Sequence, residues 1–167
     1  QINSDNNGAF NPSKVVILLL EQINSDNNGA FNPLKVVILL LEQSNVVNNG
    51  AFNYLSSATQ TLSGIISGSG TLTKDIGSSS VLTLSNASNS YSGITTISAG
   101  TIAISADANL GTASTLVPTQ LTLSGGNLRA TATFSLATNR GITLGSGGGG
   151  IDVNSGFTLT YAGAIVG

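Results

Sequence analysis

Short alternations of apolar and polar residues fill the chain from about Gln60 onward. They are separated by segments rich in Gly, Ser and Asn, and they read LTL (82–84), IAI (102–104), LTL (121–123), ITL (142–144), IDV (151–153) and TLTY (158–161). Period-two alternation bounded by turn residues predicts many short β-strands, each with one apolar face. This part of the sequence offers no amphipathic helical stripe of useful length.

The N-terminal part repeats with a period of 21 residues. Residues 1–21, QINSDNNGAFNPSKVVILLLE, recur at 22–42 with one change, and a third copy starts at Gln43 and diverges at Tyr54. Each unit reads as an Asn/Gly turn followed by an apolar run, which we interpret as a strand, although Pro12 and Pro33 could also begin helices. Insertion of whole units is typical of solenoids. We therefore expect tandem solenoid-like repeats over 1–59 and a second region over 60–167.

The expected strands fit two all-β architectures, a right-handed parallel β-helix (solenoid) and an antiparallel β-sandwich. Only 7% of the residues are charged, against about 25% in a typical globular domain. In a parallel β-helix each strand lies on the equivalent strand of the next coil, so like residues stack on like. Ladders of one charge would repel, whereas Ser, Thr and Asn ladders would hydrogen-bond. The composition therefore favours the parallel β-helix.

Composition also excludes several classes of function. The net charge is −2 without a basic patch, which argues against nucleic-acid binding. The chain has no Cys or His, so it has no disulfide scaffold, no thiolate metal site and no Ser–His or Cys–His nucleophile. The longest apolar runs, 15–20 and 36–41, are far shorter than the roughly 20 residues of a membrane span. The sequence starts at Gln1 without Met, and we expect it to be part of a longer protein.

Two glycine-rich motifs have weak functional interpretations. GSGGGG (145–150) matches G-x-G-x-x-G, but IDVNSG follows it, which predicts a strand and a turn instead of the helix that a dinucleotide site needs. GGGGIDVNS (147–155) half-matches a calcium-binding nonapeptide, but it occurs once and places Asn154 at an apolar position. We interpret both as turns, and we expect no cofactor or metal site.

The remaining candidate residues also have structural interpretations. The carboxylates of residues 60–167 are Asp75, Asp107 and Asp152; stacking could bring Asp107 and Asp152 together, but nothing in the sequence predicts such a catalytic pair. Tyr91 and Tyr161 could be exposed platforms for sugars, but we expect them to cap the core at solenoid corners. The sequon Asn86-Ala87-Ser88 is interpreted as a turn. We therefore predict no catalytic residue.

Residues 68–104 resemble the autotransporter-associated β-strand repeat. The family's usual run is G-x-L-T-K, a Gly-rich link, then L-T-L-S-x-x-N-x-Y-x-G-x-T-x-I-x-x-G-T-L. The matching positions are Gly70, Leu72, Thr73, Lys74, Leu82 to Ser85, Asn89, Tyr91, Gly93, Thr95, Ile97, Gly100 and Thr101. The chain departs from the pattern in the bulkier link DIGSSSV (75–81) and in Ile94, which replaces a second glycine. With the connector that follows, the resemblance covers roughly residues 60–167.

The resemblance implies a passenger of type V secretion in Gram-negative bacteria, with a secretory signal, a long parallel β-helix and a C-terminal outer-membrane barrel in the full chain. It implies a secreted location at the bacterial cell surface, anchored at the outer membrane. We expect a non-catalytic structural or adhesive segment without cofactors, facing a host or neighbouring cell surface, with glycans or self-association as possible partners. The alternatives are part of a β-helical surface enzyme whose catalytic site lies elsewhere in the full chain and, less favoured, a Thr-rich ice-ordering module.

Overall fold

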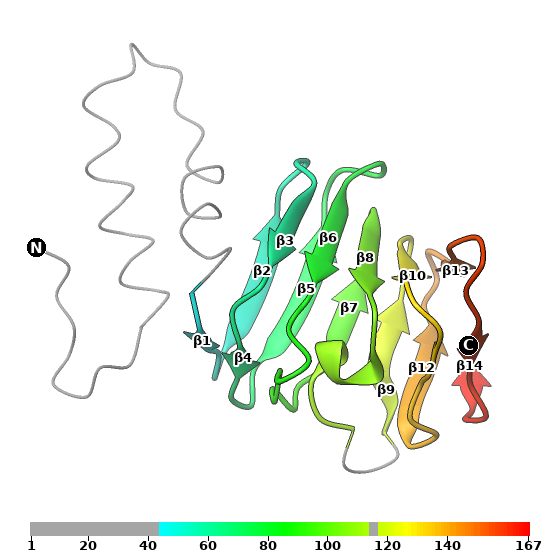
Figure 1. Ribbon diagram of the computed structural model, residues 1–167. Coiled ribbons are helices and arrows are strands. Elements are labelled where there is room, and N and C mark those ends of the chain that lie inside the picture. Colours follow the sequence, from blue (N-terminus) through cyan, green and yellow to red (C-terminus); the bar gives the residue numbers. More distant parts are fainter. Residues whose placement is uncertain (1–43, 114–116) are drawn as a thin grey trace, which may run out of the picture.

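The computed structural model describes residues 44–113 and 117–167, which wind into a stack of parallel β-coils (Figure 1). The expectation for residues 1–43 lies outside the described residues. The first coil contains β1 (Val46–Val47), β2 (Ala51–Leu55) and β3 (Gln60–Leu62). The second contains β4 (Ile66–Ser67), β5 (Thr71–Asp75) and β6 (Val81–Leu84).

The later coils repeat this order with local changes. The third contains β7 (Thr95–Ile97) and β8 (Thr101–Ile104). The fourth begins with the 3₁₀ turn η1 (Asp107–Leu110) and continues with β9 (Val117–Leu123) and β10 (Asn127–Ala130). The fifth contains β11 (Phe134–Ser135), β12 (Arg140–Leu144) and β13 (Gly150–Val153). The last contains β14 (Leu159–Thr160) and β15 (Ile165–Val166).

Every strand pair among the described residues is parallel. Six strands form one sheet in the order β15-β12-β9-β7-β5-β2, and five form a second in the order β13-β10-β8-β6-β3. The third side of the coil holds the short pairs β1–β4 and β11–β14. The predicted parallel solenoid is therefore confirmed, and the antiparallel sandwich is wrong.

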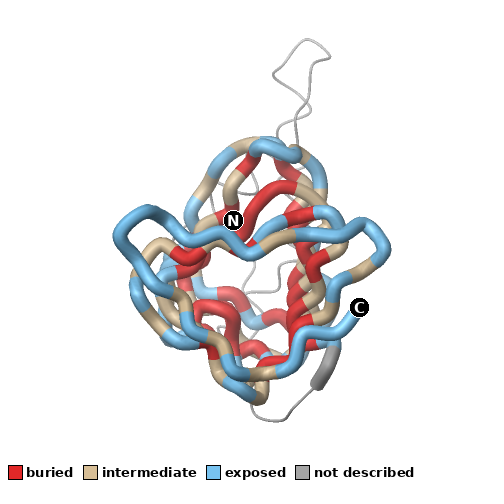
Figure 2. Tube along the Cα trace, turned by 90° about the vertical axis from the view of Figure 1, so that its right-hand side faces the viewer, coloured by how far each residue is buried: buried red, intermediate tan, exposed pale blue. Residues whose placement is uncertain are grey.

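Alternation along each strand builds a core of stacked apolar columns. In the five-stranded sheet Leu82, Ile102, Leu128 and Ile151 lie in register, and the first three are fully buried. Figure 2 shows buried stretches facing the inside of the coil and exposed stretches at the turns. Burying one Leu or Ile side chain stabilises a fold by about 1.5–3 kcal/mol, so these columns are the main source of stability.

Glycines occupy a corner where successive coils touch through their backbones. A Cβ atom on Gly93 would lie 2.2 Å from the carbonyl oxygen of Gly70, and one on Gly70 would lie 2.3 Å from that of Gly50. A side chain at Gly70 or Gly93 would therefore push the coils apart. This close contact requires glycine at the corner before β5 and before β7.

The third 21-residue copy contributes to the first coil. Asn48 is buried; its Nδ2 donates to the Thr71 carbonyl (2.9 Å) and its Oδ1 accepts the Gly50 N–H (3.2 Å). The NNG turn is thus a corner, and AFN begins β2. Ala51 pairs with Thr71, 20 positions later, so one coil is close to one repeat in length.

Candidate functional site

The outer surface of the six-stranded sheet has a column of hydroxyl side chains. Successive strands place Asn53, Thr73, Thr96, Thr122, Thr143 and Val166 in register. Like residues do stack on like, as expected for a solenoid. The hydroxyl of Thr122 donates to the Thr119 carbonyl (3.2 Å) of its own strand, so its hydrogen bond runs along the strand and not up the column.

Charged residues stack in the second sheet as an opposite pair. Arg129 lies in register with Asp152 of the next coil, and Nε of Arg129 is 2.8 Å from Oδ2 of Asp152. The Arg129 side chain is about one-third exposed and the Asp152 side chain about half exposed. The avoidance of charge in stacked columns therefore has an exception, because neighbours of opposite sign attract.

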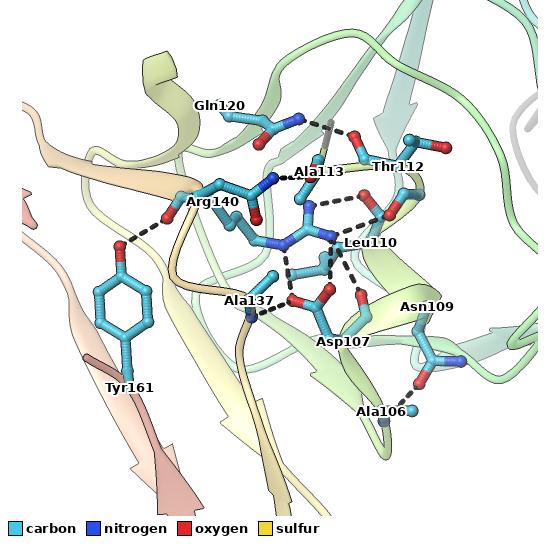
Figure 3. Close-up of polar contacts among 12 residues, drawn as sticks. Ala106, Asp107, Asn109, Leu110, Thr112, Ala113, Gln120, Ala137, Arg140 and Tyr161 are labelled. Atoms are coloured by element: carbon cyan, nitrogen blue, oxygen red, sulfur yellow. Dashed lines mark hydrogen bonds and ion pairs between the residues drawn. The ribbon is translucent and has the colours of Figure 1, made fainter. Parts of the chain in front are cut away.

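Arg140, at the start of β12, is a buried cation in the centre of a polar cluster (Figure 3). Its Nε and Nη2 contact the two carboxylate oxygens of Asp107 at 2.8 and 3.1 Å. Its Nη1 donates to the Leu110 carbonyl (3.0 Å) and its Nη2 to the Gly111 carbonyl (2.8 Å). Both carbonyls lie at the C-terminal end of η1, where backbone acceptors lack ladder partners. Arg140 therefore ties the corner of the fourth coil to the fifth.

Two further contacts complete this arginine cluster. The N–H of Ala137 donates to Oδ1 of Asp107 (3.1 Å), and Oη of Tyr161 donates to the Arg140 carbonyl (2.5 Å). The side chain of Asn109 stabilises the start of η1, because its Oδ1 accepts the N–H groups of Ser105 and Ala106, both at 2.9 Å. The cluster thus connects three successive coils through charge-assisted and backbone hydrogen bonds.

Lys74, at the end of β5, is a second buried cation. Its Nζ donates to the carbonyls of Ile76 (2.6 Å) and Asp75 (3.3 Å) and lies 5.4 Å from the centre of the Tyr54 ring. Burial lowers the pKa of Lys74 below its ordinary value, while Asp75 acts in the opposite direction. Ile76 has a φ of +63°, and its N–H donates to Oδ1 of Asp75 (2.8 Å). Lys74 and Asp75 therefore hold a strained turn in place.

The burial of Lys74 and Arg140 was not predicted from the sequence, although the alternation of the strands indicates it. Lys74 is two positions after the buried Leu72, and Arg140 is two positions before the buried Ile142. In a strand this spacing places both side chains on the inner face. Lys74 and Arg140 are overlooked only if every cation is assumed to be exposed.

The tyrosines are core residues and not exposed platforms. Tyr91 is fully buried, and its hydroxyl lies 2.9 Å from Oγ1 of Thr95. Burial raises the pKa of Tyr91 to about 12, and the bond to Thr95 and the charge of Arg140 lower it by less. Tyr161 is partly buried and its pKa is also raised by burial. Tyr91 therefore belongs to the core, and Tyr161 packs against it from the edge.

Asn89 is another buried polar side chain of the repeat motif. Its Oδ1 accepts the N–H of Ile66 and its Nδ2 donates to the carbonyl of Asn109, both at 2.8 Å. It therefore connects the second, third and fourth coils. The motif residues Asn89, Tyr91 and Gly93 all serve the contact between coils.

The other candidates from the sequence have structural roles. Asp107 and Asp152 bind different arginines and do not form a pair with each other. Gly150 begins strand β13, so no helix follows the glycine-rich motif. Asn86 forms a side-chain turn, with its Oδ1 accepting the Ser88 N–H and its Nδ2 donating to the Ser63 carbonyl, both at 2.8 Å.

The described residues contain no group of three or more His, Cys, Asp or Glu side chains that could hold a metal ion. The guanidinium of Arg140 and the carboxylate of Asp107 are used in backbone and ion-pair contacts between coils. The arrangement can fasten coils together, and it presents no free acid or base at a surface. The predicted absence of a catalytic, cofactor or metal site stays a prediction.

Comparison with known proteins agrees with this architecture. The passenger-associated-transport-repeat family matches residues 79–104, which include β6, β7 and β8. The adhesin BmaC autotransporter of Brucella suis biovar 1 (strain 1330) is 42% identical over 92 residues, which is 52% of this chain and 3% of that protein's length. No solved structure matches the chain.

Parallel coils fastened by inward Asn, Tyr, Lys and Arg side chains define a β-solenoid repeat protein. The comparisons make this class more specific: residues 79–104 match an autotransporter passenger repeat, and the chain is similar to an autotransporter adhesin. This similarity supports a secreted location at the bacterial cell surface, anchored at the outer membrane. Within the residues that the structure describes, no helix has the length and hydropathy to cross a membrane.

Proposed function

We propose that this chain is a structural, adhesive passenger segment, a non-catalytic stalk that holds adhesive surfaces away from the cell. The observation that carries the proposal is the in-register stacking of parallel coils across the matched passenger repeat. Stiffness follows from that arrangement, because every coil hydrogen-bonds to its neighbours along the axis. The adhesin name of the matched relative supports the adhesive part.

The full chain would carry a C-terminal outer-membrane barrel, and the segment would face a host or neighbouring cell surface. The matched relative is an autotransporter, and this chain spans about 3% of its length. Glycans or a second passenger are the proposed classes of partner. The division into tandem repeats over 1–59 and a β-strand repeat with its connector over 60–167 also stays a proposal.

The experiment uses the native autotransporter in its own bacterium, with residues 63–104 deleted so that the second and third coils are removed. Surface display is measured by antibody labelling, and adhesion by binding to host-cell monolayers and to sibling cells. We expect display to persist and adhesion to fall. Unchanged adhesion would contradict an adhesive or spacing role.

A replacement variant separates the stalk from the adhesive surface. Coils of equal number from another passenger replace the deleted ones. Restored adhesion means that the segment acts through length, and lost adhesion means that its own surface binds. For the non-catalytic part, we expect no hydrolysis of a polysaccharide panel by the purified chain; turnover that is lost in D107N or D152N would overturn it.

A further inference from the structure

The bend between β1 and β2 contains Asn49 followed by Gly50, and both residues are exposed. The same Asn-Gly pair occurs in the two earlier repeat copies, at positions 7–8 and 28–29. An exposed Asn-Gly pair is chemically notable because the amide of the side chain lies within reach of the next backbone nitrogen.

A hydrogen bond from the next coil holds the side chain of Asn49 and polarises its carbonyl group. Its Oδ1 accepts the backbone N–H of Ser69 in the next coil, at 3.2 Å. A donor at this oxygen stabilises the negative charge that develops there when a nucleophile adds to Cγ. The fold therefore fixes the electrophile and supplies one donor to its oxygen.

Gly50 provides a nucleophile without a shielding side chain. An ideal Cβ atom at Gly50 would have no heavy atom within 4 Å, so the space beside its Cα is open. The Gly50 N–H makes a long bond to Oδ1 of Asn48, at 3.2 Å, which is part-buried and has to open first. Because the reacting atoms belong to adjacent residues, ring closure is intramolecular and pays no association entropy.

We propose that Asn49 is a self-modification site at which the chain deamidates without an enzyme. The deprotonated nitrogen of Gly50 attacks Cγ of Asn49, the new C–N bond closes a five-membered succinimide, and the side-chain nitrogen leaves as ammonia. Water then adds to one of the two ring carbonyls and opens the ring. The products are aspartate or isoaspartate at position 49, each with one new carboxylate.

The described surroundings make the site selective. Asn48 is buried, and both of its amide atoms are hydrogen-bonded. Asn86, Asn127 and Asn154 are each followed by a residue with a Cβ atom, which hinders attack by the following nitrogen. Within residues 44–113 and 117–167, Asn49 is the one asparagine that precedes a glycine.

The modification would alter the contact between the first two coils. The Gly50 carbonyl accepts the Thr71 N–H at 2.9 Å. The isoaspartate product adds a backbone atom between positions 49 and 50, which shifts this carbonyl out of register. A carboxylate would also enter a corner that is otherwise uncharged. The slow reaction therefore loosens one corner of the solenoid with time.

The test incubates the purified, folded chain at mildly alkaline pH and then digests it with trypsin. Cleavage at lysines and arginines yields residues 36–74, which contain Asn49 as the single Asn-Gly pair, and residues 75–129, which contain none. We expect the 36–74 peptide to lose ammonia and gain an acid, seen by mass and by an isoaspartate-specific methylation assay. The 75–129 peptide should stay unchanged.

The matched control is G50A. Its new methyl group meets no neighbour, so we expect a wild-type circular dichroism spectrum and loss of the conversion. Equal conversion in folded G50A would overturn the proposal. So would an unchanged 36–74 peptide from the folded wild type when the same peptide converts in urea-unfolded protein, since the fold would then block the reaction.

Discussion

At the scale of single residues, the interior of this solenoid contains more polar chemistry than its strands suggest. Tyr54, Tyr91, Lys74 and Arg140 are all buried, and each reaches an acceptor near a corner of the coil. Corners interrupt the β-ladder and leave carbonyl groups that a side chain must satisfy. Buried polar residues here are therefore a consequence of turning the chain three times per coil.

Tyr91 makes the free energy of unfolding depend on pH in the alkaline range. Burial raises its pKa to about 12 in the folded chain, above the ordinary tyrosine value of 10.0. Between these values the unfolded chain loses a proton that the folded chain keeps, so the free energy of unfolding falls as pH rises. The largest slope is about 1.4 kcal/mol per pH unit. We expect Y91F to reduce this slope in urea unfolding curves recorded between pH 10.5 and 12.

Lys74 contributes equally to the two proteins, so it cancels in the comparison. Because the pKa of Lys74 is lowered from 10.5 in the folded chain, its contribution to stability rises with pH in the wild type and in Y91F alike. At neutral pH, Y91F should cost about 1 kcal/mol for the lost bond to Thr95. An equal alkaline slope in Y91F and wild type would contradict the assignment to Tyr91.

At the scale of elements, two arginine–aspartate pairs connect neighbouring coils in different surroundings. Both have an N–O distance of 2.8 Å, but the Arg140 side chain is 1% exposed and the Arg129 side chain 34% exposed. Burial of the arginine decides how much is lost when the cation is removed, since an unpaired, partly buried carboxylate and two carbonyls would be left behind.

We therefore expect R140M and R129M to differ strongly. R140M should lower the free energy of unfolding by about 3–5 kcal/mol, and R129M by less than about 1 kcal/mol. Thermal and urea unfolding of the two purified variants measure the difference. Similar losses for both would mean that the buried cluster does not fasten the fourth coil to the fifth.

The strands could be predicted from the sequence, whereas much of the arginine cluster could not. LTL at 82–84 and IAI at 102–104 lie in β6 and β8 because their alternation matches the pleat of a strand. The turn η1 was missed, since its four residues depend on Asn109 and on Arg140, 30 positions beyond Leu110. The partners of such contacts become neighbours only after coiling, and coil length varies: Thr95 pairs with Leu121, 26 positions later.

At the scale of the whole molecule, burial of the apolar columns decreases toward the last described coil. Leu128 and Ile142 are fully buried, whereas their column partners Ile151 and Ile165 are 38% and 51% exposed. In a linear stack each coil is stabilised by its neighbours, and the last described coil contacts only the one before it. Stability should therefore be graded along the axis.

Native-state hydrogen exchange of the purified chain tests this gradient. We expect the amides of β7 and β8, with coils on both sides, to exchange slowest, and those of β14 and β15 to exchange fastest. Peptide-resolved mass spectrometry measures the rates. Uniform protection from β2 to β15 would show that the stack opens as one cooperative unit.

The coil length reported above has a mechanical meaning. Between 20 residues, from Ala51 to Thr71, and 26 residues, from Thr95 to Leu121, are needed for each step along the axis, and that step is only about 4.8 Å. An α-helix advances about 1.5 Å with every residue. A protein built this way uses many residues for each step along its axis. It therefore projects a modest distance from its base, but as a thick rod that resists bending under flow.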